Sequence, residues 1–219
     1  MKWIAPVLAY LAVGLGIFFF HSAWGALLGF HAAILLSLLI AKPKIPLSVL
    51  WKNTNPKWIL LSVLLCGSSG VTLYFAWNRF GFAPDLSSQI ESLGLTYSTW
   101  IPFIAYFALV NPFAEEYFWR GYLGNGTKSL HLSDFLYSGF HGLILLGKVR
   151  PSSILLSLTL LMLVGWFWRQ LYREDKGLLA PVLSHMVADF TILIVVYLIT
   201  QTGPLLTYIG TQKNADKRR

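Results

Sequence analysis

Three short stretches of the sequence contain the ionisable side chains that could do chemistry among apolar residues. They read "EEYFWR", "YSGFH" and "HMVAD", and they hold Glu115, Glu116, Arg120, Tyr137, His141, His185 and Asp189. Each stretch lies in or beside a strongly apolar run, where a charge in a bilayer costs on the order of several kcal/mol. Carboxylates and imidazoles are the groups that activate water and stabilise a developing negative charge. We therefore expect a buried site that uses water.

The composition indicates an integral membrane protein. Of 219 residues, 56% are hydrophobic and 12% are charged, against about 25% charged in an average soluble protein. The mean hydropathy is +0.61. Most apolar runs approach the roughly 20 residues needed to cross a bilayer. We expect an all-α, polytopic transmembrane helical bundle of about seven or eight helices, with apolar segments at 3–20, 24–41, 58–77, 98–123, 134–147, 152–172 and 178–201.

We expect the chain, 1–219, to form a single membrane domain. Within it, residues 1–97 hold N-terminal helices without motifs, residues 98–201 hold the catalytic core helices, and residues 202–219 form a polar, basic tail whose end, "TQKNADKRR", is expected to fray. The first apolar run is too long for a typical signal peptide and is expected to stay as a helix. The fifth, 134–147, is short for a full span and is expected to be buried among its neighbours.

Charge and cysteine content exclude several classes of function. The net charge is +8, which in a membrane protein indicates basic loops beside anionic lipids rather than a nucleic-acid partner. Cys66 is the single cysteine, so an intrachain disulfide and a multi-cysteine metal site are both excluded. If the apolar segments alternate in direction, the basic residues favour a cytoplasmic N-terminus. The basic tail opposes this assignment, so the side of the C-terminus stays open.

Depth in the membrane brings the motifs together. Glu115, His141 and His185 each lie seven or eight residues from the end of an apolar segment that alternation places on the same side. At 1.5 Å per residue, each group is then about 10–12 Å below the predicted cytoplasmic face. Three helices that place polar groups in one layer predict one shared site.

Spacing within each motif suggests separate roles. Glu116 and Arg120 are four residues apart, in the order that favours an ion pair on one helix face. Glu115 points about 100° away from Glu116, so it is expected to stay free for chemistry. Tyr137 precedes His141 by four residues and could orient its ring, and His185 precedes Asp189 by the same spacing. The other histidines, His21, His31 and His131, are expected to be packing or turn residues.

The order and spacing of the motifs resemble the CAAX protease and bacteriocin-processing family (CPBP or Abi) of intramembrane endopeptidases, and are similar to the type II CAAX prenyl endopeptidases. The resemblance covers about residues 98–201. In that family the pattern is EExxxR, then an aromatic residue four positions before a histidine, then His-xxx-Asn or His-xxx-Asp. Tyr137 stands where Phe is common, and Asp189 stands where Asn is common.

This resemblance implies an intramembrane endopeptidase of the glutamate type. The substrate would be a membrane-anchored or lipidated protein or peptide, cut near its C-terminus, and the enzyme would be a multi-pass protein of a bacterial-type plasma membrane. Glu115 would activate water with help from His141. His185 and Asp189 would stabilise the oxyanion, while Glu116 and Arg120 would hold their helix in place. A carboxylate shielded from water is a better base, which agrees with the role of Glu115.

Two alternatives stay open from the sequence. No cofactor is expected, but Glu115, His141, His185 and Asp189 are also acceptable zinc ligands, so a zinc-dependent protease is an alternative. A non-proteolytic transporter or immunity protein is a second alternative, because ionisable residues inside a helical bundle also mark proton and ion pathways. The absence of an internal repeat disfavours the transporter.

Overall fold

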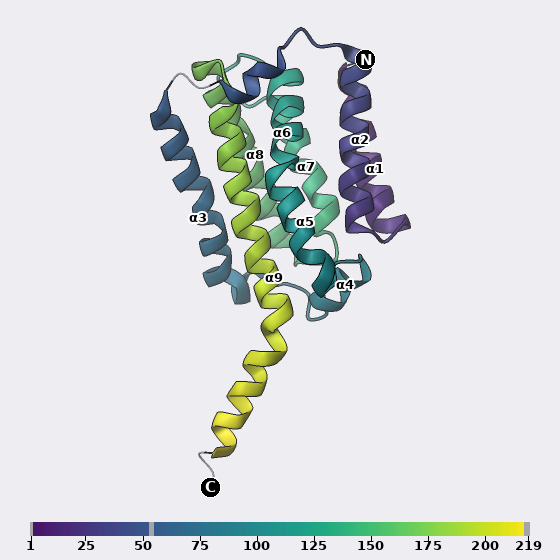
Figure 1. Ribbon diagram of the computed structural model, residues 1–219, viewed down its shortest axis with the longest axis vertical. Coiled ribbons are helices and arrows are strands. Elements are labelled where there is room, and N and C mark those ends of the chain that lie inside the picture. The colour runs from purple at the N-terminus through teal and green to yellow at the C-terminus, as the bar shows by residue number, and fades with distance from the viewer. Residues whose placement is uncertain (1, 53–54, 217–219) are drawn as a thin grey trace.

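The computed structural model shows a bundle of long helices that run in alternating directions (Figure 1). The structure describes residues 2–52 and 55–216, and for residues 202–216 the backbone alone. Within these residues, the elements are helices, and the isolated pairing between Phe82 and Val149 is not part of a strand. The predicted all-α bundle is thereby confirmed.

The N-terminal part contains three long helices and short helical turns between them. Its elements are η1 (Lys2–Ile4), α1 (Ala5–Gly14), the π-helical η2 (Leu15–Phe19), α2 (Ala23–Ala41), η3 (Leu47–Trp51) and α3 (Pro56–Phe80). Local sequence explains where two of them begin. The Ser22 hydroxyl accepts a hydrogen bond from the backbone of Gly25 at the start of α2, at 2.9 Å. Asn55 caps α3 and Pro56 occupies its first turn, where a missing N–H costs nothing.

The remaining helices contain all three motifs. They are α4 (Leu86–Ser92), α5 (Tyr97–Leu109), α6 (Asn111–Glu116), the π-helical η4 (Tyr117–Tyr122), α7 (Leu132–Leu145), α8 (Pro151–Asp175) and α9 (Leu179–Asp216). The bounds agree with the predicted segments to within a few residues, with two exceptions. The short helices η3 and α4 lie in stretches expected to be loops. The helix α9 continues into the segment expected to be a polar tail, as far as Asp216, and residues 217–219 lie outside the described residues.

Among the described residues, five helices are long and apolar enough to cross a membrane by length and composition, and a sixth span is possible if α4 and Tyr97–Tyr122 count as one. Those two pieces meet at an angle of 81°. With 14 residues, α7 is too short for the same criterion. It packs against α1 and α8, as expected for a short segment surrounded by its neighbours.

The start of α7 is fixed by a capping box. The His131 ring accepts a hydrogen bond from the backbone N–H of Ser133, and the Asp134 carboxylate accepts one from the backbone N–H of His131 at 2.9 Å. Burial, together with the nearby charge of Arg169, lowers the pKa of His131. A low pKa keeps the ring neutral and able to accept. His131 is therefore a helix cap, in agreement with its expected turn position.

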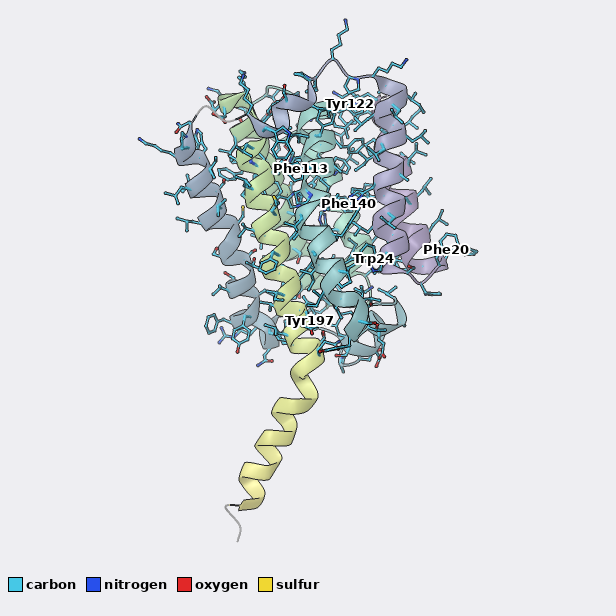
Figure 2. The ribbon with its side chains drawn as sticks, viewed as in Figure 1. Phe20, Trp24, Phe113, Tyr122, Phe140 and Tyr197 are labelled. Atoms are coloured by element: carbon cyan, nitrogen blue, oxygen red, sulfur yellow. The ribbon has the colours of Figure 1, made fainter. Side chains whose placement is uncertain are left out.

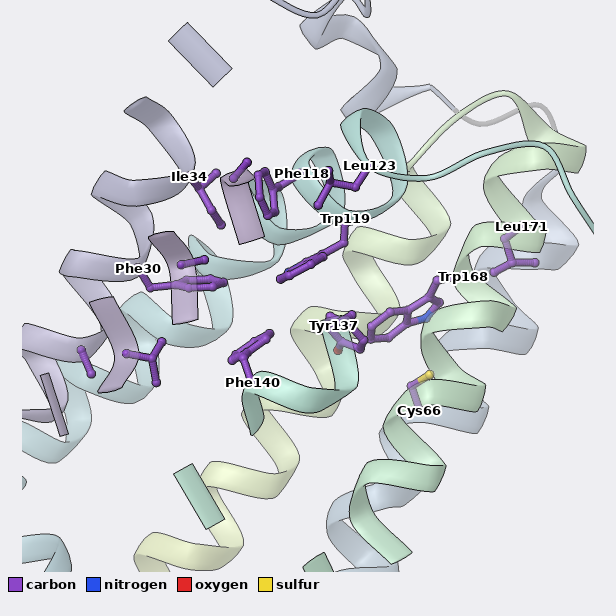
Figure 3. Packing of buried hydrophobic residues seen from close by; sticks show 14 of the residues in the cluster. Phe30, Ile34, Cys66, Phe118, Trp119, Leu123, Tyr137, Phe140, Trp168 and Leu171 are labelled. Carbon is purple, nitrogen blue, oxygen red and sulfur yellow. The ribbon is translucent and has the colours of Figure 1, made fainter. Parts of the chain in front are cut away.

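Packing places the motif helices at the centre of the bundle. α9 lies along both α3 and α5, α1 lies along α2, and α7 lies along α8 (Figure 1). An aromatic cluster fills the space between the N-terminal helices and the motif helices; it includes Phe30, Trp119, Tyr137, Phe140 and Trp168 (Figure 3). The Trp119 and Phe140 rings are stacked, with centroids 5.8 Å apart. This cluster forms one wall of the site described next.

Candidate active site

The helix that holds Glu115 and Glu116 is irregular on both sides of them. Pro112 has no backbone N–H, so the helix is interrupted at Val110 and begins again as α6. After Glu116 the backbone widens into a π-helix, in which Leu123 N–H donates to the Phe118 carbonyl five residues back, at 2.9 Å. Such π-helical turns are rare and are found mostly at functional sites.

Glu115 is buried and has one oxygen without a protein partner. Its side chain is 2% exposed. The Asn111 amide, one turn earlier on α6, donates to Glu115 Oε1 at 2.8 Å. Among the described residues, Glu115 Oε2 has no hydrogen-bond partner. A buried carboxylate oxygen without a donor is an uncommon and costly arrangement, and it marks a place where a ligand can bind.

Glu116 lies in the interior and joins two motifs. Its Oε1 is 3.2 Å from Arg120 Nη1 and accepts a hydrogen bond from His185 Nδ1 at 2.8 Å. The predicted ion pair between Glu116 and Arg120 is therefore present, and His185 on α9 is an additional partner. Glu116 is fully buried, so this carboxylate holds α9 against the helix that contains Glu115.

Arg120 lies between two aromatic rings. Its guanidinium carbon is 3.8 Å from the centroid of the Tyr137 ring and 4.9 Å from that of Trp168. Cations over such ring faces are attracted to them. α8 approaches closely here because residue 165 is glycine: a Cβ at that position would lie 2.9 Å from Tyr137 Cδ1 and 3.0 Å from Arg120 Nη2.

His141 is held by the backbone rather than by the Tyr137 hydroxyl. Its Nδ1 lies 2.9 Å from the Tyr137 carbonyl oxygen, and a carbonyl can only accept, so Nδ1 bears the proton. In a neutral ring, Nε2 is then free to accept. Tyr137 was expected to orient His141, and it contacts His141 through its backbone carbonyl and its ring, with the two ring centroids 5.1 Å apart.

His185 and Asp189 lie together on α9. His185 Nε2 is 3.5 Å from Asp189 Oδ2, and the imidazole stacks on Trp168 with centroids 4.5 Å apart. The Tyr137 ring lies between the two histidines, 6.2 Å from the His185 ring. The structure thus brings all seven motif residues into one region. Within residues 2–52 and 55–216, however, no direct hydrogen bond or ion pair joins His141 to Glu115, His185 or Asp189.

The donor set does not fit a metal ion as it is arranged. In the described part of the chain, no three side chains among His, Cys, Asp and Glu are placed so that they could hold one. Glu116 occupies His185 Nδ1, and Tyr137 occupies His141 Nδ1, so each ring offers at most one further nitrogen. No step of the chemistry proposed below passes through a metal.

A cavity of about 270 Å³ begins at Glu115. Glu115 and Asn111 form part of its wall, and most other lining side chains are apolar, from α1, α2, α4, α5, α7 and α9. Lys148 also contributes to the lining. In Figure 2, Phe140, which lines the cavity, lies near the middle of the bundle, well inside the ends of the helices. The cavity can therefore hold an apolar chain next to a carboxylate.

Two residues near Glu115 were not identified as site residues from the sequence. His31, expected to be a packing residue, bonds to Asn111, and Asn111 drew no attention because it stands before a proline in "VNPF". One signal was available, since Asn111 is four residues before Glu115 and so on the same helix face.

The comparisons with known proteins agree with this geometry. No curated protein and no solved structure matches the chain. A family model does match part of it, and that part includes every residue of the three motifs and the whole of α5, α6, η4, α7 and α8. The match agrees with the family predicted from the motifs: residues 97–191 match the model of the Rce1-like family, described as type II CAAX prenyl endopeptidase Rce1-like.

Proposed function

We propose that this protein is an intramembrane glutamate-type endopeptidase that cuts a lipidated or membrane-anchored protein or peptide near its C-terminus. The family match supports a protease of the CAAX endopeptidase type in general, and the candidate spans support an integral membrane protein. The catalytic type rests on one observation. Glu115 is buried, one of its oxygens is fixed by Asn111, and the other is unpartnered beside an apolar cavity.

In the proposed reaction, Glu115 acts as the general base. Its free Oε2 takes a proton from a water molecule while the water oxygen bonds to the carbonyl carbon of the scissile peptide bond. His141 assists by accepting a hydrogen bond from the same water at Nε2. The proton then passes from Glu115 to the leaving nitrogen as the C–N bond breaks, which gives a carboxylic acid and an amine. A carboxylate kept away from bulk water is a stronger base for this step.

His185 and Asp189 would stabilise the oxyanion of the tetrahedral intermediate. Glu116 accepts from His185 Nδ1, and its negative charge favours a protonated imidazole whose Nε2–H can donate to the oxyanion. Asp189 lies next to Nε2 and, when protonated, supplies a second donor. Donors that are already oriented in a site without bulk water lower the barrier more than they would in water. Arg120 balances the charge of Glu116.

The cavity supports an apolar substrate group. A volume of about 270 Å³ with mostly apolar walls suits an isoprenoid chain or the apolar side chains of a membrane anchor. Because Glu115 lies in the wall of this cavity, the peptide bond next to the bound apolar group would lie beside the Glu115 carboxylate. We place the enzyme in a bacterial-type plasma membrane, with the site about 10–12 Å below the cytoplasmic face, a depth derived from the helical rise.

The test is cleavage of defined substrates by the purified protein in lipid vesicles. A panel of C-terminally tagged lipidated and helix-anchored peptides would be followed by mass spectrometry. Glu115→Gln should lower the rate by at least about 10³-fold while the fold is kept, because the amide cannot accept the proton. Glu91→Gln, on the exposed face of α4, is the matched control and should cleave normally. Normal turnover by Glu115→Gln would refute the assignment.

A further inference from the structure

A chain of polar side chains that the proposed reaction does not use leads from α2 and α5 to Glu115. Tyr106 OH lies 3.0 Å from His31 Nδ1, His31 Nε2 lies 2.9 Å from Asn111 Oδ1, and Asn111 Nδ2 lies 2.8 Å from Glu115 Oε1. His31 and Asn111 are buried, with exposures of 6% and 1%. Side chains from α5, α2 and α6 thus form one chain of hydrogen bonds that ends at a single carboxylate oxygen of Glu115.

The chemistry of each group fixes the direction of these bonds. An ionised Glu115 can only accept, so Asn111 must present its NH₂ group to Oε1. The Asn111 carbonyl oxygen then faces His31 and needs a donor, which makes His31 the tautomer with a proton on Nε2. His31 Nδ1 is left as an acceptor for the Tyr106 hydroxyl. Every donor points towards the carboxylate, and one buried polar group satisfies the next.

The surroundings keep this chain in place. The His31 ring lies 5.5 Å from the Tyr106 ring and 6.0 Å from Phe30, centroid to centroid. The Trp24 ring lies 5.6 Å from that of Tyr106. The Asp189 side chain is a further polar neighbour of the Asn111 amide. Rotation of the amide would turn its carbonyl oxygen towards Glu115 and leave the His31 donor without an acceptor, so rotation is costly. In this arrangement Oε1 of Glu115 is occupied, and Oε2 has no hydrogen-bond partner among the described residues.

We propose that His31 and Asn111 are positioning residues that hold the Glu115 carboxylate and select Oε2 as the oxygen that receives the proton. His31 acts only through Asn111, because it does not touch Glu115. The catalytic consequence rests on the proposed function, whereas the effect on the carboxylate itself does not.

Kinetics provide the first test. His31→Phe keeps a ring of similar size but removes the donor, and it should lower kcat by about 10-fold to 100-fold with little change in KM, the range seen for partners that orient catalytic ligands. His31→Gln, whose amide can still donate to Asn111, should recover most of the rate. His21→Phe is the matched control, since His21 is exposed in the turn before α2. An active His31→Phe enzyme would overturn the proposal.

A double-mutant cycle tests whether His31 acts through Asn111. Asn111→Leu removes the bond to Glu115 directly and should cost at least as much as His31→Phe. If the two residues form one chain, the double variant should be no worse than Asn111→Leu alone. Fully additive losses would show that His31 acts by a different route and would overturn the proposal.

An infrared titration of the Glu115 carboxyl band decides the matter without a substrate. The band is identified by subtraction of the Glu115→Gln spectrum. His31→Phe should move the midpoint of this titration to higher pH, because Asn111 would then donate a weaker hydrogen bond to the carboxylate, which favours the protonated acid. The other charged groups that face Glu115 are His185, Asp189 and Arg120. An unchanged midpoint would refute the proposal. If the wild type cleaves nothing, the proposed function fails, and this titration still tests the positioning role.

Discussion

At the scale of single residues, two adjacent carboxylates have different environments because they point to different faces of one helix. Glu116 bonds to Arg120 and His185, so it is committed to holding two helices together. Each acid has an Oε2 without a hydrogen-bond partner among the described residues. Glu115 differs in that it bonds to Asn111 through Oε1 and forms part of the cavity wall. A 100° step along the helix thus separates the acid that joins two helices from the acid proposed to act as the general base.

Arg120→Ala should destabilise the fold as well as stop the reaction. The change leaves Glu116 buried without its ion-pair partner and empties the space between Tyr137 and Trp168, for a cost of about 3–5 kcal/mol. Thermal unfolding in detergent, followed by tryptophan fluorescence, should show a clearly lower Tm. The control is Arg173→Ala, which removes a partly exposed pair with Glu174 and should change stability by no more than about 1 kcal/mol. A stable but inactive Arg120→Ala would make Arg120 catalytic rather than structural.

Asp189→Asn should keep much of the activity. If Asp189 donates as a neutral acid or orients His185, an amide of the same shape can replace it. If Asp189 were a zinc ligand instead, the same change would weaken metal binding, and the wild type would lose activity with a chelator and regain it with zinc. Metal content and chelator sensitivity, measured for both proteins in parallel, separate the two cases. Stoichiometric zinc in the wild type that is absent from Asp189→Asn would refute the metal-free mechanism.

At the scale of elements, the site depends on how closely α8 approaches the motif helices. Gly165→Ala would place a methyl group 2.9 Å from Tyr137 and 3.0 Å from Arg120. Such overpacking costs about 1–3 kcal/mol, against a gain of at most about 1 kcal/mol in helix propensity. We expect a lower Tm and lower activity, because both neighbours must move. Gly14→Ala in α1 meets no atom within 4 Å and should be neutral or stabilising. Equal Tm changes in the two variants would refute this packing argument.

The sequence predicts the long helices well because each is a long apolar run with clear ends. The double acid, Glu115 and Glu116, also marks the helix that contains the candidate site. The π-helical turn at Tyr117–Tyr122 was not predicted, because the sequence pattern gave residues 98–123 as one apolar segment without a change of helix type. The same holds for His31: a histidine in an apolar run looks like a packing residue until the fold places Asn111 2.9 Å away. Motif residues are visible in sequence, and Asn111 could have been found by its spacing from Glu115, whereas His31 is brought to Asn111 by a contact between residues 80 positions apart.

At the scale of the whole molecule, apolar side chains face outwards along the bundle. The most exposed large ones include Phe75, Leu39, Leu155 and Leu64, which come from α2, α3 and α8. In water such a surface would aggregate, whereas lipid covers it at no cost. The buried ionisable groups lie at the centre, where helices rather than lipid surround them. This separation of surfaces is what allows a polar site to exist inside a bilayer.

The termini should lie on opposite sides of the membrane, with the N-terminus in the cytoplasm. Figure 1 shows the two ends of the chain at opposite ends of the bundle. Basic residues gather at the end of the bundle where the chain begins, which favours the cytoplasmic side for that end. They include Lys2, Lys42, Lys44, Lys52, Lys57 and Lys176, whereas Arg79, Lys148 and Arg150 lie at the other end of the helices.

A reporter that is active only outside the cytoplasm should work when fused after residue 219 and fail when fused before residue 1. Because the basic tail opposes this orientation, replacement of Lys217, Arg218 and Arg219 by Gln should leave the result unchanged or strengthen it. Two reporters on the same side would contradict the alternation of helices, and a reversed result would place the site near the outer face.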